Sequence, residues 1–178
     1  QTVDVWAYYN NADEVELFLN GKSVGVQSKK GDDLHVMWKV PFQPGTLKAI
    51  SRKNGKTVLE TEIKTAGNPS NLKLTADRST IKADGNDLSF VTVDILDEKG
   101  TLTPKANNEI SFSLKGNGKI VGVCSGDPTS HESYKGTKHT ALNGKCLVVI
   151  KSGDKAESLE LTATANGLKT ATIQIATE

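Results

Sequence analysis

Cysteine, aromatic residues and long apolar runs are scarce in this sequence of 178 residues, which has two Cys, two Trp, three Tyr and four Phe. Two cysteines are too few for the disulfide framework of a small secreted domain. No apolar run approaches the ~20 residues of a membrane-spanning helix, so we expect no membrane insertion. The start, Gln1-Thr2-Val3, has no signal-peptide pattern, and any export signal would lie upstream.

A strong charge of either sign is also missing. The 22 Lys+Arg and 21 Asp+Glu residues give a formal net charge of +1. Without a basic field, the chain has no long-range attraction for nucleic acid or for an anionic membrane, and we expect neither partner. We interpret the scattered lysines, for instance Lys29, Lys30, Lys53 and Lys56, as solvent-facing strand positions.

Helical periodicity is absent as well, and short alternating runs of Val, Ile, Thr and Leu are separated by Asn-Gly, Asp-Gly, Lys-Gly and Pro-Gly pairs. The pattern predicts an all-β fold. Sandwich domains of the immunoglobulin class have roughly 100 residues, so we expect two tandem immunoglobulin-like β-sandwiches. Thr65–Asn71 contains turn formers and no large apolar side chain. We therefore place the boundary there, between a domain of residues 1–67 and one of residues 68–178.

The alternation predicts six strands in the first domain and about seven in the second. The even-numbered residues from Leu34 to Val40 share one face of their strand, and we predict that they are buried, Trp38 among them. The expected strands are 3–8, 15–19, 23–26, 34–40, 46–53 and 57–64 in the first domain, and 72–77, 88–97, 109–115, 119–124, 145–152, 158–165 and 169–176 in the second.

Two stretches carry a resemblance to a known family. Residues 3–25 read VDVWAYYNNADEVELFLNGKSVG, with alternating strands around an Asn-Gly hairpin signal, and residues 126–132 read GDPTSHE. They resemble, respectively, the start of the first sandwich after the catalytic barrel and a loop of the last sandwich in bacterial β-galactosidases of glycoside hydrolase family 2. The second half also resembles bacterial immunoglobulin-like modules of the invasin type.

The resemblance implies an accessory region with no catalytic residues of its own. In these enzymes two catalytic glutamates lie on a (β/α)₈ barrel that would precede residue 1, and a barrel needs at least ~200 residues. Glycoside hydrolysis requires two carboxyl groups across a cleft, whereas nearly all of the acidic residues here are expected in turns or on solvent faces of strands. We expect that the chain by itself is not an enzyme and needs no cofactor.

The same resemblance implies the chain's partners and location. The chain would brace the barrel and other domains of a retaining β-galactosidase-like parent, shape its substrate cleft or mediate oligomer contacts. The parent would be exported to the periplasm, the cell surface or the medium of a bacterium. The alternative is an autonomous carbohydrate-binding or adhesion module that contacts β-galactosides or polysaccharides.

The stretch 125–143 is the one segment long enough to carry a site between two strands. It is interpreted as a cleft or interdomain loop, as a local turn opened by Asp127 with a His131–Glu132 pair, or as a metal site. No ligand pair has the spacing of a known closed site, so we expect no metal. The candidate residues of a cleft or interdomain loop are Asp127, Ser130, His131 and Glu132. The metal interpretation uses Asp127, His131, Glu132 and His139, with Cys124 as an additional candidate ligand.

The aromatic candidates lie near the start of the chain. Trp6 and Tyr8 alternate with Val3 and Val5, so if the valines are core, the rings are exposed or packed against another domain. Three roles stay open for Trp6, Tyr8 and Tyr9: stacking on a sugar, interdomain contact, or burial in their own core. An aromatic content of 5% argues against sugar binding as the main task.

The two cysteines, Cys124 and Cys146, both lie in apolar strand contexts. Strands that flank one long loop often pair, but nothing in the sequence fixes the separation of the two sulfur atoms. In the resembling enzymes the place of Cys146 often holds Cys, whereas that of Cys124 usually does not. The resemblance therefore implies no family disulfide, and an oxidising compartment would still allow a bridge specific to this chain.

Overall fold

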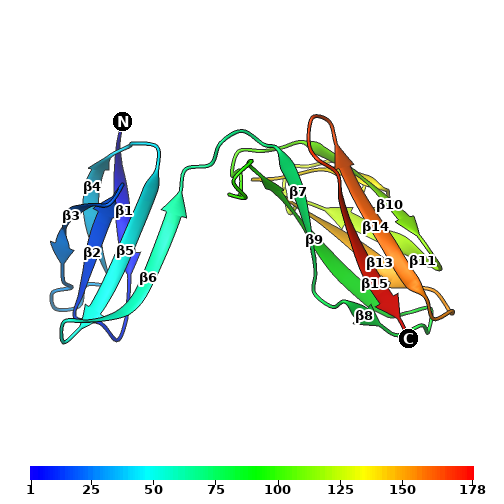
Figure 1. Cartoon of the computed structure of the whole chain (residues 1–178), viewed down its shortest axis with the longest axis horizontal. Helices are drawn as coiled ribbons and strands as arrows, with labels where there is room; N and C mark the ends of the chain where they lie inside the picture. The colour runs from blue at the N-terminus through cyan, green and yellow to red at the C-terminus, as the bar shows by residue number, and fades with distance from the viewer. The chain divides into compact units, whose positions relative to one another are not determined.

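The computed structural model describes all 178 residues and contains strands but no helix, which confirms the all-β prediction. No helix is present that could cross a membrane. The chain divides into two compact units, Gln1–Thr65 and Ala66–Glu178 (Figure 1). The division falls two residues before the expected boundary, because the Gly67 N–H donates to the carboxylate of Asp97 in the second unit at 2.8 Å.

The first unit is a sandwich of a two-stranded and a four-stranded antiparallel sheet. Every strand lies within one residue of its expected bounds. The two-stranded sheet has the order β1-β4, and the facing sheet has the order β3-β2-β5-β6. The strands are β1 (Thr2–Tyr8), β2 (Glu14–Leu19), β3 (Lys22–Gln27), β4 (His35–Pro41), β5 (Thr46–Lys53) and β6 (Lys56–Lys64).

Two Asn-Gly pairs close the hairpins of the four-stranded sheet. Asn20 and Gly21 have φ angles of 52° and 79°, and Asn54 and Gly55 have 50° and 73°, as a tight two-residue turn requires. Asn20 also accepts a hydrogen bond from the Thr46 N–H at 2.8 Å through its side-chain oxygen. The turn residues therefore set the register of β2, β3, β5 and β6.

The core of the first unit is small and centres on Trp38. The indole N–H of Trp38 donates to the Gly25 carbonyl at 3.2 Å, which satisfies its polar atom. Leu34 is 77% exposed, so its expected burial with Trp38 is wrong. The reason is that β4 begins at His35, and Leu34 lies before the alternation starts. The buried apolar residues are Val15, Leu17, Val36, Trp38 and Val40.

The second unit is a larger sandwich with sheet orders β12-β10-β14-β15-β8 and β11-β13-β9-β7. All seven expected strands are present, and two short ones, β8 and β12, were not predicted. The strands are β7 (Asn71–Ala76), β8 (Thr80–Ile81), β9 (Leu88–Leu96), β10 (Glu109–Lys115), β11 (Gly118–Cys124), β12 (Lys138–Thr140), β13 (Lys145–Ser152), β14 (Ser158–Ala165) and β15 (Ala171–Thr177).

Both sheets of the second unit contribute to one apolar core. The central pair of one sheet is β9 with β13, where Val91 lies opposite Val148 and both are fully buried. In the other sheet, Leu161 of β14 lies between Leu114 of β10 and Ile173 of β15. This core is large enough to stabilise the unit without a disulfide.

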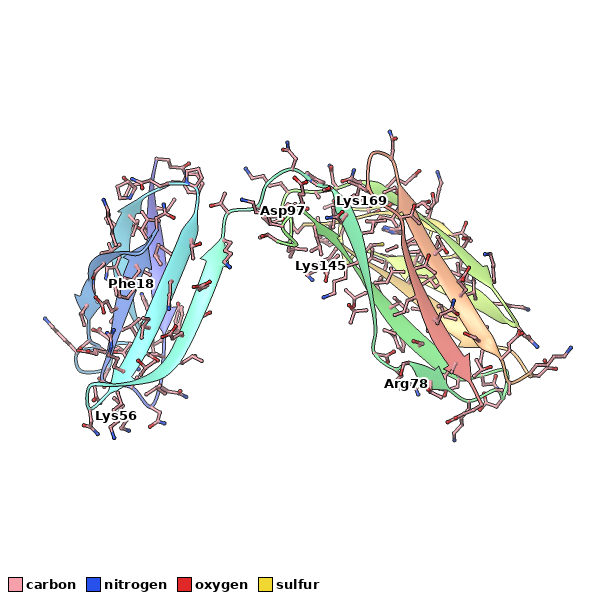
Figure 2. All side chains as sticks on the ribbon, in the orientation of Figure 1. Phe18, Lys56, Arg78, Asp97, Lys145 and Lys169 are labelled. Carbon is pink, nitrogen blue, oxygen red and sulfur yellow. The ribbon has the colours of Figure 1, made fainter.

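Asp97 organises the turn at the end of β9 (Figure 2). This turn lies beside Gly67, close to the point where the chain enters the second unit. The Asp97 carboxylate accepts backbone N–H bonds from Gly67 and Thr101 at 2.8 Å and from Lys99 at 2.9 Å. The bonds from Gly67 and Thr101 are the main reason that the pKa of Asp97 lies below its ordinary value. The ionised carboxylate therefore stabilises the folded unit.

We predict that Asp97→Asn weakens the acid sensitivity of the second unit. The folded-state pKa is lowered, so the stabilisation is present above the unfolded-state pKa of about 4 and is lost as the pH falls through the folded value. Urea unfolding followed by circular dichroism between pH 7 and pH 3 measures this loss. Glu98→Gln, in the same turn, should retain the wild-type pH dependence. If the free energy of unfolding changed equally with pH in both variants, the prediction would be contradicted.

Candidate functional site

One candidate surface is the outer face of the β1–β4 sheet. The register places Trp6 opposite Met37 and Tyr8 opposite His35. Trp6 and Tyr8 are 54% and 64% exposed. The Trp6 ring stacks on His35 with a centroid distance of 4.9 Å, and Tyr8 lies 5.0 Å from the same imidazole. We call Trp6, Tyr8, His35 and Met37 the β1–β4 aromatic face.

The structure separates Tyr9 from this face. Tyr9 is partly buried against the core of the first unit. Its hydroxyl accepts the Lys29 N–H at 2.9 Å, and the Lys29 ammonium group lies 4.7 Å from the ring centroid. Of the three roles considered for Tyr9, the structure therefore supports burial in its own unit. Sequence reasoning missed His35, although its alternation with Met37 on β4 was the available signal.

The second candidate is the loop 125–137, which is shorter than expected because β12 takes up residues 138–140. Asp127 Oδ1 accepts hydrogen bonds from the Thr129 hydroxyl at 2.7 Å and the Thr129 N–H at 2.8 Å. These bonds, that of the hydroxyl first, lower the pKa of Asp127. Ser130 Oγ accepts the Glu132 N–H at 3.2 Å. The structure thus contains the turn opened by Asp127, which was one of the three interpretations of this loop.

Glu132 joins this loop to β12. Its Oε2 accepts the Thr140 N–H at 2.9 Å, and its Oε1 accepts the Thr140 hydroxyl at 2.8 Å. The bonds from Thr140 are the main cause of the lowered pKa of Glu132, and His139 adds to them. The expected His131–Glu132 pair is therefore wrong, because both Glu132 oxygens are engaged by β12. His131 is exposed.

His139 is buried beneath the loop, with a side chain that is 1% exposed. Its Nδ1 lies 3.1 Å from Glu132 Oε2 and 2.9 Å from the Thr140 carbonyl. Both neighbours are acceptors, so Nδ1 carries the proton and donates to them. The ring of Tyr134 stacks on His139 at 6.2 Å with an angle of 8°. These contacts hold the loop against β12.

The cysteines are both free. Cys124 on β11 lies directly opposite Leu147 on β13. Cys146, which precedes Leu147 on β13, lies opposite Val93 in the core. Residues that oppose each other share a face, so the two cysteine side chains lie on opposite faces of the sheet and form no disulfide. Burial raises the pKa of Cys146 to about 12.

The loop and the aromatic face both present exposed side chains at the surface, where they could contact another molecule or domain. No three His, Cys, Asp or Glu side chains are grouped so that they could hold a metal ion. The carboxylates of Asp127 and Glu132 are each occupied by hydrogen bonds to hydroxyl and backbone groups of the fold. The residues brought together, Glu132 with His139 and Thr140, order the loop.

Comparisons with known proteins identify the family. Residues 72–174 match the family described as glycoside hydrolase family 2 C-terminal domain 5. The chain belongs to this glycoside hydrolase family 2 C-terminal domain family. Residues 1–59 match a second family, described as a domain of unknown function, DUF4982. The resemblance expected from residues 3–25 and 126–132 is therefore confirmed at the level of the family.

Relatives of this family 2 chain are considerably longer than the chain itself. It is 54% identical over all 178 residues to the β-galactosidase BoGH2A of Bacteroides ovatus and spans 21% of that protein. A solved family 2 member from Bacteroides cellulosilyticus has a TM-score of 0.95 and 36% identity, covering 100% of this chain and 23% of its own. A β-glycosidase from Bacteroides vulgatus has a TM-score of 0.92 and 31% identity, covering 99% and 22%.

Proposed function

We propose that this chain is the non-catalytic C-terminal region of a retaining, β-galactosidase-like family 2 enzyme and that it braces the catalytic barrel. The observation that carries the proposal is the match of the whole chain to about a fifth of a β-galactosidase. An all-β chain offers no scaffold for the barrel that holds the two reacting carboxylates. Export of the parent to the periplasm, cell surface or medium is part of the proposal, and cell fractionation tests it.

The β1–β4 aromatic face is the proposed contact with another domain of the parent. Exposed apolar clusters mark interaction sites, whereas single exposed apolar residues are ordinary. Here two large rings, an imidazole and the 38%-exposed Met37 lie together on one sheet face. Covering this face with the barrel or a preceding sandwich would bury the indole and phenol rings, and the phenol hydroxyl of Tyr8 would face the rim.

The loop 125–137 is the proposed wall of the substrate cleft. Glu132 attaches the middle of the loop to Thr140, and the Asp127 turn orders the residues before it. An ordered loop presents its remaining polar groups at less entropic cost than a flexible one. Ser130 and the exposed His131 are the groups that we propose for contacts across the cleft.

An autonomous sugar-binding module is the second candidate, and the exposed ring of Trp6 favours it. Against it, the rings of Trp6 and Tyr8 meet at 65°, so they offer no common plane for a flat sugar face. One side of the indole is also stacked on His35. The geometry is therefore closer to that of a protein contact than to that of a sugar platform.

The test uses the full parent enzyme and the 178-residue chain in parallel. Trp6→Ala should lower the temperature at which the parent loses aryl β-galactoside hydrolysis, while Phe90→Ala, which removes a 42%-exposed ring from the second unit, should not. The isolated chain should neither hydrolyse the substrate nor bind a glycan array. Saturable glycan binding by the folded chain that Trp6→Ala abolishes would replace bracing with the second candidate.

A further inference from the structure

Strand β6 alternates between apolar and charged residues, but the structure buries neither side of it. The β5–β6 register pairs Ile63 with Leu47 and Leu59 with Ser51, which places Leu59 and Ile63 on the core face of the sheet. Glu60 and Glu62 occupy the opposite face, where Glu60 forms an ion pair with Lys48 at 2.5 Å. This is the pattern of a half-buried strand, yet every residue of β6 is exposed.

Burial on the core face falls steadily from β2 to β6. Leu17 of β2 is 1% exposed, Leu47 of β5 is partly buried, and Leu59 and Ile63 of β6 are 64% and 69% exposed. The facing sheet has two strands against four. It therefore covers β2 and part of β5 and ends before it reaches β6.

The strand of the smaller sheet nearest to β6 is β1. Its partner β4 lies at the opposite side, beside β3, because the Trp38 indole donates to Gly25 and the Gln27 side chain donates to the Met37 carbonyl. Figure 1 shows the same order, with β1 behind β2 and β5 and with β6 at the uncovered side. The free edge of β1 therefore faces the space above Leu59 and Ile63.

The backbone of β1 has an unused set of donors along this edge. Phe42 N–H donates to the Gln1 carbonyl at 2.9 Å, so the hydrogen-bonded pairs with β4 fall at the odd-numbered residues of β1. The N–H groups of Asp4, Trp6 and Tyr8 consequently point away from β4. No hydrogen-bond partner occurs for any of the three. A free strand edge of this kind accepts another strand.

We propose that a further strand of the parent polypeptide, from outside residues 1–178, pairs with the free edge of β1 and covers Leu59 and Ile63. The proposal rests on the proposed function, because it requires a longer parent chain, and BoGH2A extends well beyond the 21% matched here. A third strand in the smaller sheet makes a seven-stranded sandwich, the number typical of immunoglobulin-like domains. The added strand carries apolar residues at alternate positions toward β6.

Hydrogen exchange of the parent and of the 178-residue chain tests the backbone pairing. In the parent, the amides of Asp4, Trp6 and Tyr8 should exchange at least about tenfold more slowly than in the isolated chain. The amides of Val5 and Ala7, already bonded to β4, serve as the matched control and should be protected in both proteins. Equal exchange at Asp4, Trp6 and Tyr8 in the two proteins would overturn the proposal.

Thiol labelling in a Cys124→Ser background tests the covered side chains. Ile63→Cys should react with a maleimide in the isolated chain and resist it in the parent, whereas Glu62→Cys, on the other face, should react in both. Protection of Ile63→Cys without slowed β1 amides would indicate a covering surface other than a strand and would overturn the proposal. Concentration-dependent protection in the isolated chain would assign the edge to a second copy and would also overturn it. Hydrolase activity of the parent is assayed separately, so a failure of the strand-pairing proposal can be distinguished from a failure of the proposed function.

Discussion

Leu161→Ala is expected to destabilise the second unit by about 2 to 5 kcal/mol, the range for truncating a buried leucine. Leu161 is fully buried on β14, between Leu114 and Ile173 of the two neighbouring strands. Three adjacent strands surround the site, so it has little freedom to collapse around the lost atoms. Urea unfolding followed by circular dichroism measures the change.

The two tryptophans make the effect of this change separable. Trp6 and Trp38 both lie in the first unit, so tryptophan emission reports that unit alone, whereas circular dichroism reports both units. Leu161→Ala should shift the dichroism transition of the second unit and leave the emission transition in place, because each unit has its own core. Thr164→Ala, on the exposed face of the same strand, should change stability by no more than about 0.5 kcal/mol. A joint shift of both transitions would show that the units unfold as one.

Trp38→Ala is expected to cost the first unit about 3 to 5 kcal/mol, as truncation of a buried aromatic residue does. Trp38 is 4% exposed in a cluster of only five buried residues, and its indole N–H is bonded to Gly25. At ~0.05 to 0.15 kcal/mol per residue, a unit of this size has a stability of roughly 3 to 10 kcal/mol, so the loss removes a large part of it. We therefore expect the unfolding midpoint of the first unit to fall strongly.

Trp6→Ala provides the matched control, since it removes the same side chain from a position that is 54% exposed. In the isolated chain this control should change the unfolding midpoint of the first unit only slightly. Trp6 emission monitors Trp38→Ala, and Trp38 emission monitors Trp6→Ala. Trp38→Phe retains a ring but lacks the indole donor, so its unfolding midpoint should lie between the midpoints of Trp38→Ala and Trp6→Ala. A wild-type midpoint for Trp38→Ala would contradict the assignment of Trp38 to the core.

The strands were predictable because apolar and polar residues alternate over six to nine positions between clear turn signals. Asn20-Gly21 and Asn54-Gly55 fixed two hairpins, since both turns need positive φ angles. Strands β8 and β12 have two and three residues, too short for alternation to be visible. The prediction for Leu34 failed for a related reason, because the end of a strand cannot be placed to a single residue. Leu34 lies one position before β4 and is exposed, although it continues the apolar alternation of that strand.

The candidate site was predictable only where local alternation decided it. Side chains alternate between the two faces of a strand, so Trp6 and Tyr8 could be placed on the face opposite the core valines. The stacking of Trp6 on His35 depends instead on the register between β1 and β4. The partners of Glu132 depend on where β12 pairs with β10, which no local pattern reveals. The opposite facing of the two cysteines likewise follows from the register of β11 and β13.

The strand order of the second unit sets the sequence of events when the chain folds. Lys145 on β13 pairs with Asp94 on β9, although 51 residues separate them. The hairpins of the first unit need only the two-residue turns at Asn20 and Asn54. Pairing of distant strands loses the entropy of closing a long loop before the contacts between the strands can stabilise the pair, so it slows folding. Hairpins, in contrast, form within microseconds. During synthesis the first unit therefore gains structure early, and the second unit waits until β13 has left the ribosome and can insert beside β9.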